Sequence, residues 1–232
     1  DVYKRQGVFN IVNGTGAVVG EALTAHPDVA KISFTGSSAV GQHLVSAGAA
    51  TMKRVTLELG GKSPTVVLDD ADFAAVMPLI LQGGFMNSGQ ACVAGTRILV
   101  PRHRLAEFEQ AMLDAVSRIK SGDPREADTD IGPMVSARQW ERVQGYIRLG
   151  TQEGARLLAG GEGRPQGLGA GWFVKPTIFT DVQNEMRIAQ EEIFGPVLAI
   201  IAYDDDAHAI ALANDTRYGL SAMVLGLSLI HI

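Results

Sequence analysis

The stretch VTLELGGKSPTVVLD, residues 55–69, contains two β-rich runs separated by a double glycine. VTLEL (55–59) and PTVVLD (64–69) are predicted strands, because Val, Thr and Leu are frequent in both runs. The pair Gly60-Gly61 is typical of a break between elements. We therefore expect one strand to end at the glycine pair and another to begin just after it.

Strand-like and helix-like segments alternate outward from this stretch in both directions. This alternation predicts an α/β protein with a mainly parallel sheet. Residues 121–133, rich in Gly, Pro and Asp, interrupt the pattern as a loop, and the Gly-rich residues 160–171 are a flexible loop or a hairpin. Beyond 55–59 and 64–69, the predicted strands are 8–12, 30–34, 97–100, 176–179 and 197–203, and the predicted helices are 16–26, 38–50, 72–85, 104–120, 136–155 and 207–215.

The composition excludes several classes of protein. Of the 232 residues, 46% are hydrophobic and 19% charged, the net charge is −5, and no block of Lys or Arg stands out. We therefore expect neither a nucleic-acid partner nor a membrane partner. No apolar run approaches the ~20 residues of a membrane span, and no signal peptide is visible. The single cysteine fits a reducing compartment, so we expect a cytoplasmic protein. The five histidines are scattered, and we expect no metal site.

The only cysteine, Cys92, lies in NSGQACVAGTR, residues 87–97. It follows a predicted helix and precedes a predicted strand, so it lies on a short connection with backbone amides nearby. Such amides stabilise a thiolate and later an oxyanion. A cysteine among small residues is also typical of a buried, inert filler. Locally, both interpretations stay open.

Glu58 stands at the end of a predicted strand, directly before the glycine pair. Acidic residues are poor strand formers and are costly inside a sheet. A carboxylate at the carboxyl end of a strand lies where α/β proteins bind ligands. The alternative is a surface carboxylate that pairs with Lys62.

Two glycine-containing turns each follow a predicted strand and open a predicted helix. GTGAVVG (14–20) resembles a dinucleotide-binding loop with one extra residue, although a simple turn with helix-packing glycines explains it as well. FTGSSAVG (34–41) places Gly36 and Ser37 at a helix start, where free N–H groups bind anions. A plain Gly-Ser cap is its alternative.

QEEIFGPV (190–197) combines adjacent carboxylates with Phe194 before a Gly-Pro turn. A carboxylate such as Glu192 can hold a ribose diol, and an aromatic ring can pack against a flat heterocycle. An exposed acidic pair beside a core phenylalanine is the alternative interpretation.

Taken in order, these motifs closely resemble the aldehyde dehydrogenase superfamily. The resemblance covers residues 7 to about 225 and includes the segments VFNIVNGTG, HPDVAKISFTGS, KRVTLELGGKSP, FMNSGQACVAGTR, PTIFTDV, EEIFGPV and ANDTRYGLSA. ELGGKSP and GQAC are the most specific of them, and the 34 positions between Glu58 and Cys92 match the family's spacing.

The resemblance implies a function as well as a fold. It implies an aldehyde dehydrogenase-like α/β fold with a Rossmann-type cofactor domain and a catalytic domain. Cys92 would attack an aldehyde, and Glu58 would activate the water that releases the acid. NAD or NADP would be the cofactor. The positions that match its binding residues are Gly14, Gly16, Phe34, Thr35, Gly36, Ser37, Val40, Leu59, Gly60, Glu192 and Phe194, with Gly41 closing the second turn.

The resemblance also implies that this chain is a fragment. Residues 1–60 match the later half of the cofactor domain, and residues 61–232 match an incomplete catalytic domain. A Pro-Trp-Asn segment that completes the oxyanion hole is missing, as are positions that select NAD or NADP. We expect the full-length protein to be a homo-oligomer and this chain alone to be inactive. The ends, residues 1–6 and about 226–232, look foreign to the pattern.

Three hypotheses about the function stay open at this point. The first is hydrolytic oxidation of an aldehyde. The second is transfer of the acyl group to coenzyme A, against which Glu58 argues, because that branch typically lacks this glutamate. The third is a catalytically dead fragment or a binding module. The sequence does not select a particular aldehyde.

Overall fold

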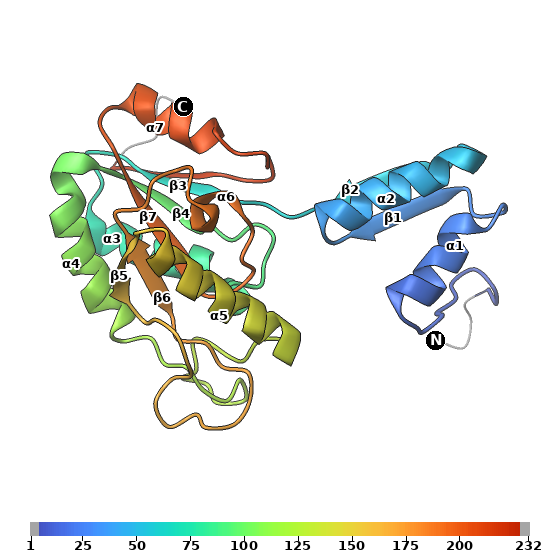
Figure 1. Cartoon of the computed structure of the whole chain (residues 1–232), viewed down its shortest axis with the longest axis horizontal. Helices are drawn as coiled ribbons and strands as arrows, with labels where there is room; N and C mark the ends of the chain where they lie inside the picture. The colour runs from blue at the N-terminus through green and yellow to red at the C-terminus, as the bar shows by residue number, and fades with distance from the viewer. Residues whose placement is uncertain (1–4, 228–232) are drawn as a thin grey trace. The chain divides into compact units, whose positions relative to one another are not determined.

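Two packing units make up the chain, Asp1–Leu59 and Gly60–Ile232. A computed structural model describes residues 5–227 (Figure 1). The expectation that the two ends are foreign falls partly on residues 1–4 and 228–232, which lie outside the described residues.

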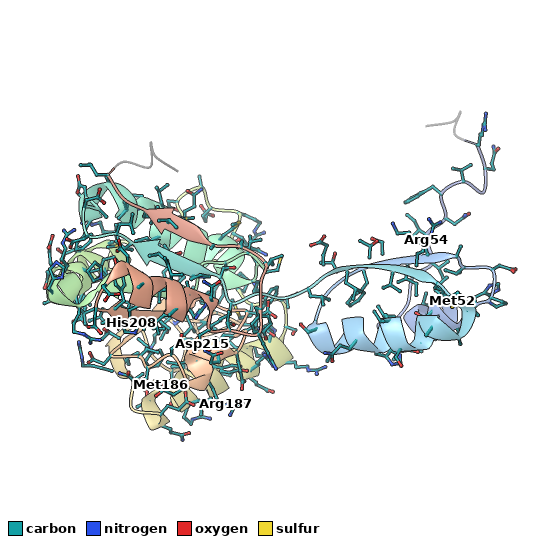
Figure 2. The ribbon with its side chains drawn as sticks, turned by 90° about the horizontal axis from the view of Figure 1, so that it is seen from above. Met52, Arg54, Met186, Arg187, His208 and Asp215 are labelled. Atoms are coloured by element: carbon teal, nitrogen blue, oxygen red, sulfur yellow. The ribbon has the colours of Figure 1, made fainter. Side chains whose placement is uncertain are left out.

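The first unit is built on a parallel β-α-β arrangement. Strands β1 (Lys31–Thr35) and β2 (Arg54–Glu58) pair in parallel, and helix α2 (Ser38–Gly48) connects them (Figure 1). The helix lies close to the sheet at a small residue, because a Cβ on Gly41 would meet the side chains of Leu57 and Leu59. After α2, Met52 adopts a left-handed backbone with a φ of 54° and leads the chain into β2 (Figure 2).

The prediction of a strand at residues 8–12 is wrong. These residues are exposed and form no strand in the structure. A β-strand requires a hydrogen-bonded neighbour, and no described strand lies beside this segment. The predicted helix at 16–26 is a π-helical turn, Gly16–Gly20, followed by the short helix α1 (Glu21–Ala25).

The second unit contains a six-stranded sheet in the order β5-β6-β7-β4-β3-β8. All neighbours pair in parallel except β5, which is antiparallel to β6. The sequence analysis did not predict β5 or β8. The strands are β3 (Pro64–Val67), β4 (Arg97–Pro101), β5 (Arg156–Ala159), β6 (Thr177–Thr180), β7 (Val197–Tyr203) and β8 (Met223–Leu225).

Helices cover both faces of this sheet (Figure 1). Side chains of α3 (Phe73–Phe85) and α4 (Leu105–Val116) share one hydrophobic core, and those of α5 (Ala137–Gln152), α6 (Arg187–Gln190) and α7 (Asp206–Asn214) share the other. Successive residues of the central strands alternate between these cores, which is why the strands read as continuous apolar runs.

Side-chain caps fix where several helices begin. The Asp72 carboxylate accepts a hydrogen bond from the backbone N–H of Ala74 at 2.9 Å and caps α3. The Ser136 hydroxyl does the same for α5, at 3.2 Å from the N–H of Gln139. Such caps satisfy backbone donors that have no partner inside the helix. They place the first turn of each helix at a defined residue.

Candidate active site

Three loops that carry candidate residues lead into three neighbouring strands of the second unit. The loop around Cys92 precedes β4, the loop with Glu192 precedes β7, and the Gly60-Gly61 turn precedes β3. These strands are adjacent and parallel, in the order β7-β4-β3. Their amino ends therefore share one edge of the sheet, and the topology brings the three loops together there. α/β proteins more often bind ligands at the opposite, carboxyl edge.

Cys92 occupies a tight turn, residues 91–94, which we call the thiol turn. The backbone N–H of Ala94 donates to the carbonyl oxygen of Ala91 at 3.1 Å. Cys92 is partly exposed and is not in a disulfide. Its carbonyl oxygen faces the glycine turn, because a Cβ on Gly61 would lie 2.8 Å from that oxygen. The thiol is therefore on a solvent-accessible turn rather than in the core, which disfavours the filler interpretation.

A strained stretch of backbone leads into the thiol turn. Asn87, Ser88 and Gly89 have φ values of 50°, 60° and 72°. Left-handed backbone at Asn87 and Ser88 is unfavourable for side-chain-bearing residues. Hydrogen bonds hold it: the Ser88 hydroxyl donates to the carbonyl oxygen of Gly132 at 3.0 Å, and the Gln90 amide donates to that of Asn87 at 3.2 Å. The approach to Cys92 is thus fixed before any ligand binds.

Glu192 lies against the glycine pair. A Cβ on Gly60 would collide with its carboxylate, and the N–H of Gly61 donates to Glu192 Oε1 at 3.4 Å. Burial raises the pKa of Glu192, and the N–H of Gly61 and the charges of Arg142 and Lys62 oppose this rise. The structure therefore joins two predicted cofactor residues, Gly60 and Glu192, in one contact.

Lys62 is 2% exposed. Because its side chain is buried, it does not fit the alternative of a surface ion pair with Glu58. Burial, and then the charge of Arg97, lower the pKa of Lys62 to about 7, while Glu192 and Glu191 oppose the shift. Lys62 also lines a cavity of about 580 Å³ between α7 and the strands β3 and β8. Lys62, directly after Gly61, therefore contributes a buried amine rather than a surface cation.

Phe194 is 36% exposed and has a φ of 61°. Helix α5 holds the backbone beside it, since Gln139 Nε2 donates to the carbonyl oxygens of Ile193 at 3.1 Å and Phe194 at 2.7 Å. Arg142 donates to the carbonyl oxygen of Glu192 at 2.7 Å. Gln139 and Arg142 are not apparent as candidates from the sequence, where their only signal is a three-residue spacing on a predicted helix.

Glu58 and the second glycine-containing turn meet in the first unit. Glu58 is the last residue of β2 and is exposed, and its carbonyl oxygen accepts a hydrogen bond from the N–H of Gly36 at 3.0 Å. Thr35 pairs with Glu58 in the sheet register. Ser37 caps α2 by accepting from the N–H of Val40 at 3.4 Å. The carboxyl ends of β1 and β2 therefore present these residues together.

Of the remaining predicted residues of the first unit, two pack within it and two are exposed. Phe34 folds over Gly36, because a Cβ on that glycine would collide with the ring. Leu59 packs against α2 at Gly41. Gly14 and Gly16 are exposed, and Gly16 is the first residue of the π-helical turn. No described hydrogen bond joins either glycine to the turn at Gly36.

A buried guanidinium ties the second unit together beneath this edge. Arg97 is 0% exposed and donates to the carbonyl oxygens of Lys62 at 3.0 Å, Leu212 at 2.9 Å and Ala213 at 2.8 Å. It also donates to Asn184 Oδ1 at 3.0 Å, and Asn184 donates in turn to the carboxylate of Asp215 at 2.8 Å. Arg97 is another residue that the sequence analysis did not select.

Residues 5–227 contain neither a candidate metal site nor a candidate membrane span. No group of three or more His, Cys, Asp or Glu side chains in this range is arranged to hold a metal ion. Among the helices in the same range, none combines the length and apolar character needed to cross a membrane.

Sequence comparisons match the whole described chain. The model of the aldehyde dehydrogenase family matches residues 5–232. A curated protein of Staphylococcus saprophyticus that carries an aldehyde dehydrogenase name is 49% identical over 221 residues, which cover 95% of this chain and 46% of that protein. A similarly named protein of Staphylococcus haemolyticus is 48% identical over the same shares. The chain thus spans about half the length of the curated relatives it matches.

Solved structures match equally well. Aldehyde dehydrogenase C of Pseudomonas syringae, a cysteine-to-alanine variant in complex with NAD+ and octanal, is 50% identical with a TM-score of 0.92, over 94% of this chain and 45% of that one. An NAD+ complex of a Mycobacterium tuberculosis aldehyde dehydrogenase is 51% identical with a TM-score of 0.88, over 90% and 43%. Sequence and fold agree along almost the whole length, and the chain belongs to the aldehyde dehydrogenase family.

Proposed function

We propose that this chain is part of an NAD(P)-dependent aldehyde dehydrogenase that oxidises an aldehyde to a carboxylic acid. The observation that carries the proposal is the meeting of the thiol turn, the Glu192 loop and the Gly60-Gly61 turn at one edge of the sheet. The backbone of Cys92 and the carboxylate of Glu192 both lie against the Gly60-Gly61 turn, an arrangement that suits a nucleophile near a cofactor. The relatives in complex with NAD+, one of them also with octanal, support the assignment.

The described residues fit a dinucleotide. In the second unit, the Glu192 carboxylate lies against Gly60 and Gly61, where it can accept hydrogen bonds from both hydroxyls of a ribose. The exposed ring of Phe194 can pack beside a nicotinamide. In the first unit, Gly36, Ser37 and Val40 begin α2, whose free N–H groups suit a pyrophosphate. We assign residues 1–60 to the cofactor domain and residues 61–232 to the catalytic domain. Thr35 and Phe34 flank the pyrophosphate turn, Leu59 adjoins the carboxamide position, and Gly14 and Gly16 turn near the adenosine.

Cys92 is the proposed nucleophile. Its thiolate adds to the aldehyde carbonyl, and backbone N–H groups of the thiol turn stabilise the resulting oxyanion. Bound NAD or NADP would supply the acceptor for the hydride that leaves this adduct, and Cys92 would then carry a thioester. Because the left-handed run at residues 87–89 fixes the turn in advance, the thiol does not have to be reorganised on binding.

Glu58 is the proposed general base. Its carboxylate is exposed at the end of β2. In the complete enzyme it would take a proton from the water that attacks the thioester. Hydrolysis would then return the free thiol and release the acid. Transfer of the acyl group to coenzyme A is the second candidate, and the presence of a carboxylate at position 58 favours hydrolysis.

The test uses the full-length protein with an aldehyde series and with NAD or NADP. We expect absorbance at 340 nm to rise and the matching acid to appear in equal amount without coenzyme A. Formation of an acyl-coenzyme A in place of the acid would move the assignment to the second candidate. No reduced cofactor with any aldehyde would refute the dehydrogenase assignment.

Three properties of the whole protein complete the proposal. We expect a homo-oligomer, which mass photometry of the full-length protein would check. The single cysteine favours the reducing cytoplasm. This chain by itself should give no steady turnover, because it spans about half the length of its relatives. Steady NADH production by the purified chain would contradict that expectation.

A further inference from the structure

The segment before β8, YGLSA (218–222), reaches both the thiol turn and the glycine pair. It belongs to the motif ANDTRYGLSA, to which the proposed function gives no role. The side chain of Leu220 lies against Gly61, since a Cβ on that glycine would be 3.2 Å from Leu220 Cβ. The same Cβ would be 2.8 Å from the carbonyl oxygen of Cys92. The segments that precede β3, β4 and β8 therefore meet at Gly61.

Two serines lie side by side at the amino ends of β3 and β8. These strands pair in parallel with Thr65 opposite Met223, and Ser63 and Ser221 each come two residues earlier. Their hydroxyl oxygens are 2.8 Å apart. Ser63 is 3% exposed, whereas Ser221 is exposed. The register of the two strands therefore brings one buried and one exposed hydroxyl into contact.

The contact between the serines continues to the residue after Cys92. Ser221 Oγ donates a hydrogen bond to the carbonyl oxygen of Val93 at 3.4 Å. A serine hydroxyl has a single proton, so Ser63 is the donor in its bond with Ser221. The hydrogen bonds thus run in one direction, from Ser63 through Ser221 to Val93. We call Ser63 and Ser221 the serine tether.

The serine tether holds a peptide group that also closes the thiol turn. The N–H of Ala94 donates to the carbonyl oxygen of Ala91, and it shares a rigid peptide plane with the carbonyl group of Val93. Among residues 5–227, Ser221 is the only hydrogen-bond donor to the carbonyl oxygen of Val93. Rotation of this peptide would break both bonds together. The tether therefore fixes the orientation of the turn from outside it.

We propose that Ser63 and Ser221 are positioning residues, which fix the peptide after Cys92 and so hold the thiol in place for attack on the aldehyde. The inference rests on the proposed function, because it assumes that Cys92 is the nucleophile. Without the tether, the thiol turn would also adopt orientations from which the thiol does not attack. Both serines act through the carbonyl group of Val93. They are therefore not catalytic residues.

The experiment compares variants of the full-length protein with wild type. Ser221→Ala removes the donor to Val93, and because Ser221 is exposed, its truncation leaves no cavity. Ser221→Thr keeps a hydroxyl and tests rescue. Ser117→Ala is the matched control, since it removes another exposed hydroxyl that donates to a backbone carbonyl oxygen, that of Asp114 at 2.8 Å.

Two measurements separate positioning from stability. The rate of the first turnover, followed as NADH formation with saturating aldehyde and cofactor, reports on attack by the thiol. Hydrogen exchange in the peptide covering residues 91–96 reports on the N–H of Ala94. The Kd for the cofactor and the unfolding temperature, measured on the same samples, show that each variant is folded and binds the cofactor.

Ser221→Ala should slow the first turnover about tenfold, which corresponds to about 1.4 kcal/mol and is of the size expected for one lost hydrogen bond. Its Kd for the cofactor should stay near that of wild type, because the tether does not reach Glu192. Hydrogen exchange in residues 91–96 should quicken. Ser221→Thr should recover most of the rate, and Ser117→Ala should match wild type in both measurements.

Ser63→Ala tests whether the two serines act in series. Because Ser63 acts only through Ser221, Ser63→Ala should slow the first turnover less than Ser221→Ala does. The double variant should be no slower than Ser221→Ala alone, since residues in one hydrogen-bond network are not additive. Losses that multiply in the double variant would contradict the tether.

Three further results would overturn the inference. They are an unchanged first turnover in Ser221→Ala, an equal loss in Ser221→Ala and Ser221→Thr, and unchanged exchange in residues 91–96. If Ser221→Ala does not fold, Ser221→Val is compared with Ser221→Thr, which has nearly the same shape, and equal rates in that pair would also overturn it. Failure of the proposed function is separate, since wild type would then form no NADH with any aldehyde, while hydrogen exchange would still test the tether.

Discussion

The backbone of Gly89 lies directly against the carbonyl group of Gly195, and a Cβ on Gly89 would overlap its carbon and oxygen atoms. This contact joins the segment before Cys92 to the loop that carries Glu192. Because Gly89 also has a φ of 72°, any other residue there would suffer both a collision and backbone strain.

Gly89→Ala should therefore separate the two loops. We expect aldehyde oxidation by the full-length protein to fall at least about a hundredfold, since a displacement of about 1 Å at a reacting centre has that effect. The matched control is Gly145→Ala on α5, where a Cβ meets nothing within 4 Å and helix propensity improves. Steady-state kinetics and thermal unfolding of both variants check this. Near-normal activity in Gly89→Ala would mean that the contact is dispensable.

Cys92→Ser tests the nucleophile. A serine hydroxyl ionises far less readily than a thiol and has no adjacent base in the thiol turn to activate it. We expect oxidation to be abolished while the Kd for the cofactor stays near that of wild type. Retention of even a tenth of the activity would assign the nucleophile to another group.

Glu58→Gln tests the base. The side chain keeps its size but cannot accept a proton from water, so the thioester on Cys92 should persist. We expect up to one equivalent of NADH per active site in a rapid first turnover, followed by very slow release. Mass spectrometry should find the acyl group on the peptide that contains Cys92. Turnover at the wild-type rate would exclude Glu58 as the base, and loss of the first turnover would mean that it also deprotonates the thiol.

The lowered pKa of the buried Lys62 predicts that the stability of the protein depends on pH. Its pKa is about 7 in the folded state, against 10.5 for an ordinary lysine. Between about pH 7 and 10 the unfolded chain therefore holds a proton that the folded chain has released, and stability rises with pH. Below about pH 7 both states are protonated, and the full cost of burying the cation is present.

Lys62→Met should remove this dependence. The unfolding temperature of the variant, compared with that of wild type at the same pH, should be highest near pH 6. This difference should disappear by pH 9. Lys120→Met, which changes a half-exposed lysine, is the control and should show no such trend. If the unfolding temperature of Lys62→Met differs from that of wild type by the same amount at pH 6 and at pH 9, Lys62 does not titrate in this range.

The sequence was sufficient for elements whose pattern is local. The helix predicted at 72–85 is observed at Phe73–Phe85, because Asp72 caps it and apolar residues repeat along its buried face. The strand predicted at 197–203 coincides with β7. VFNIV at 8–12 has the same local character and forms no strand, because strand formation depends on a neighbour that sequence patterns do not identify.

The candidate site divides in the same way. Glu192 and Phe194 were selected as candidates because a distinctive motif contains both. Gln139 and Arg142 were not, because polar residues on an amphipathic helix are usually a solvated face, and only the fold brings α5 to residues 192–194. Arg97 opens β4 as one charge in a predicted strand, and nothing local indicates that it is buried with four hydrogen bonds.

The partners of Arg97 also impose an order on biosynthesis. Its guanidinium needs acceptors from Lys62, 35 positions earlier, and from Leu212 and Ala213, 115 and 116 positions later. A buried guanidinium without its acceptors is strongly destabilising. The ribosome, adding roughly 5–20 residues each second, therefore exposes β4 for several seconds before the end of α7 exists. Arg97 therefore cannot be buried with all of its acceptors until α7 has been made.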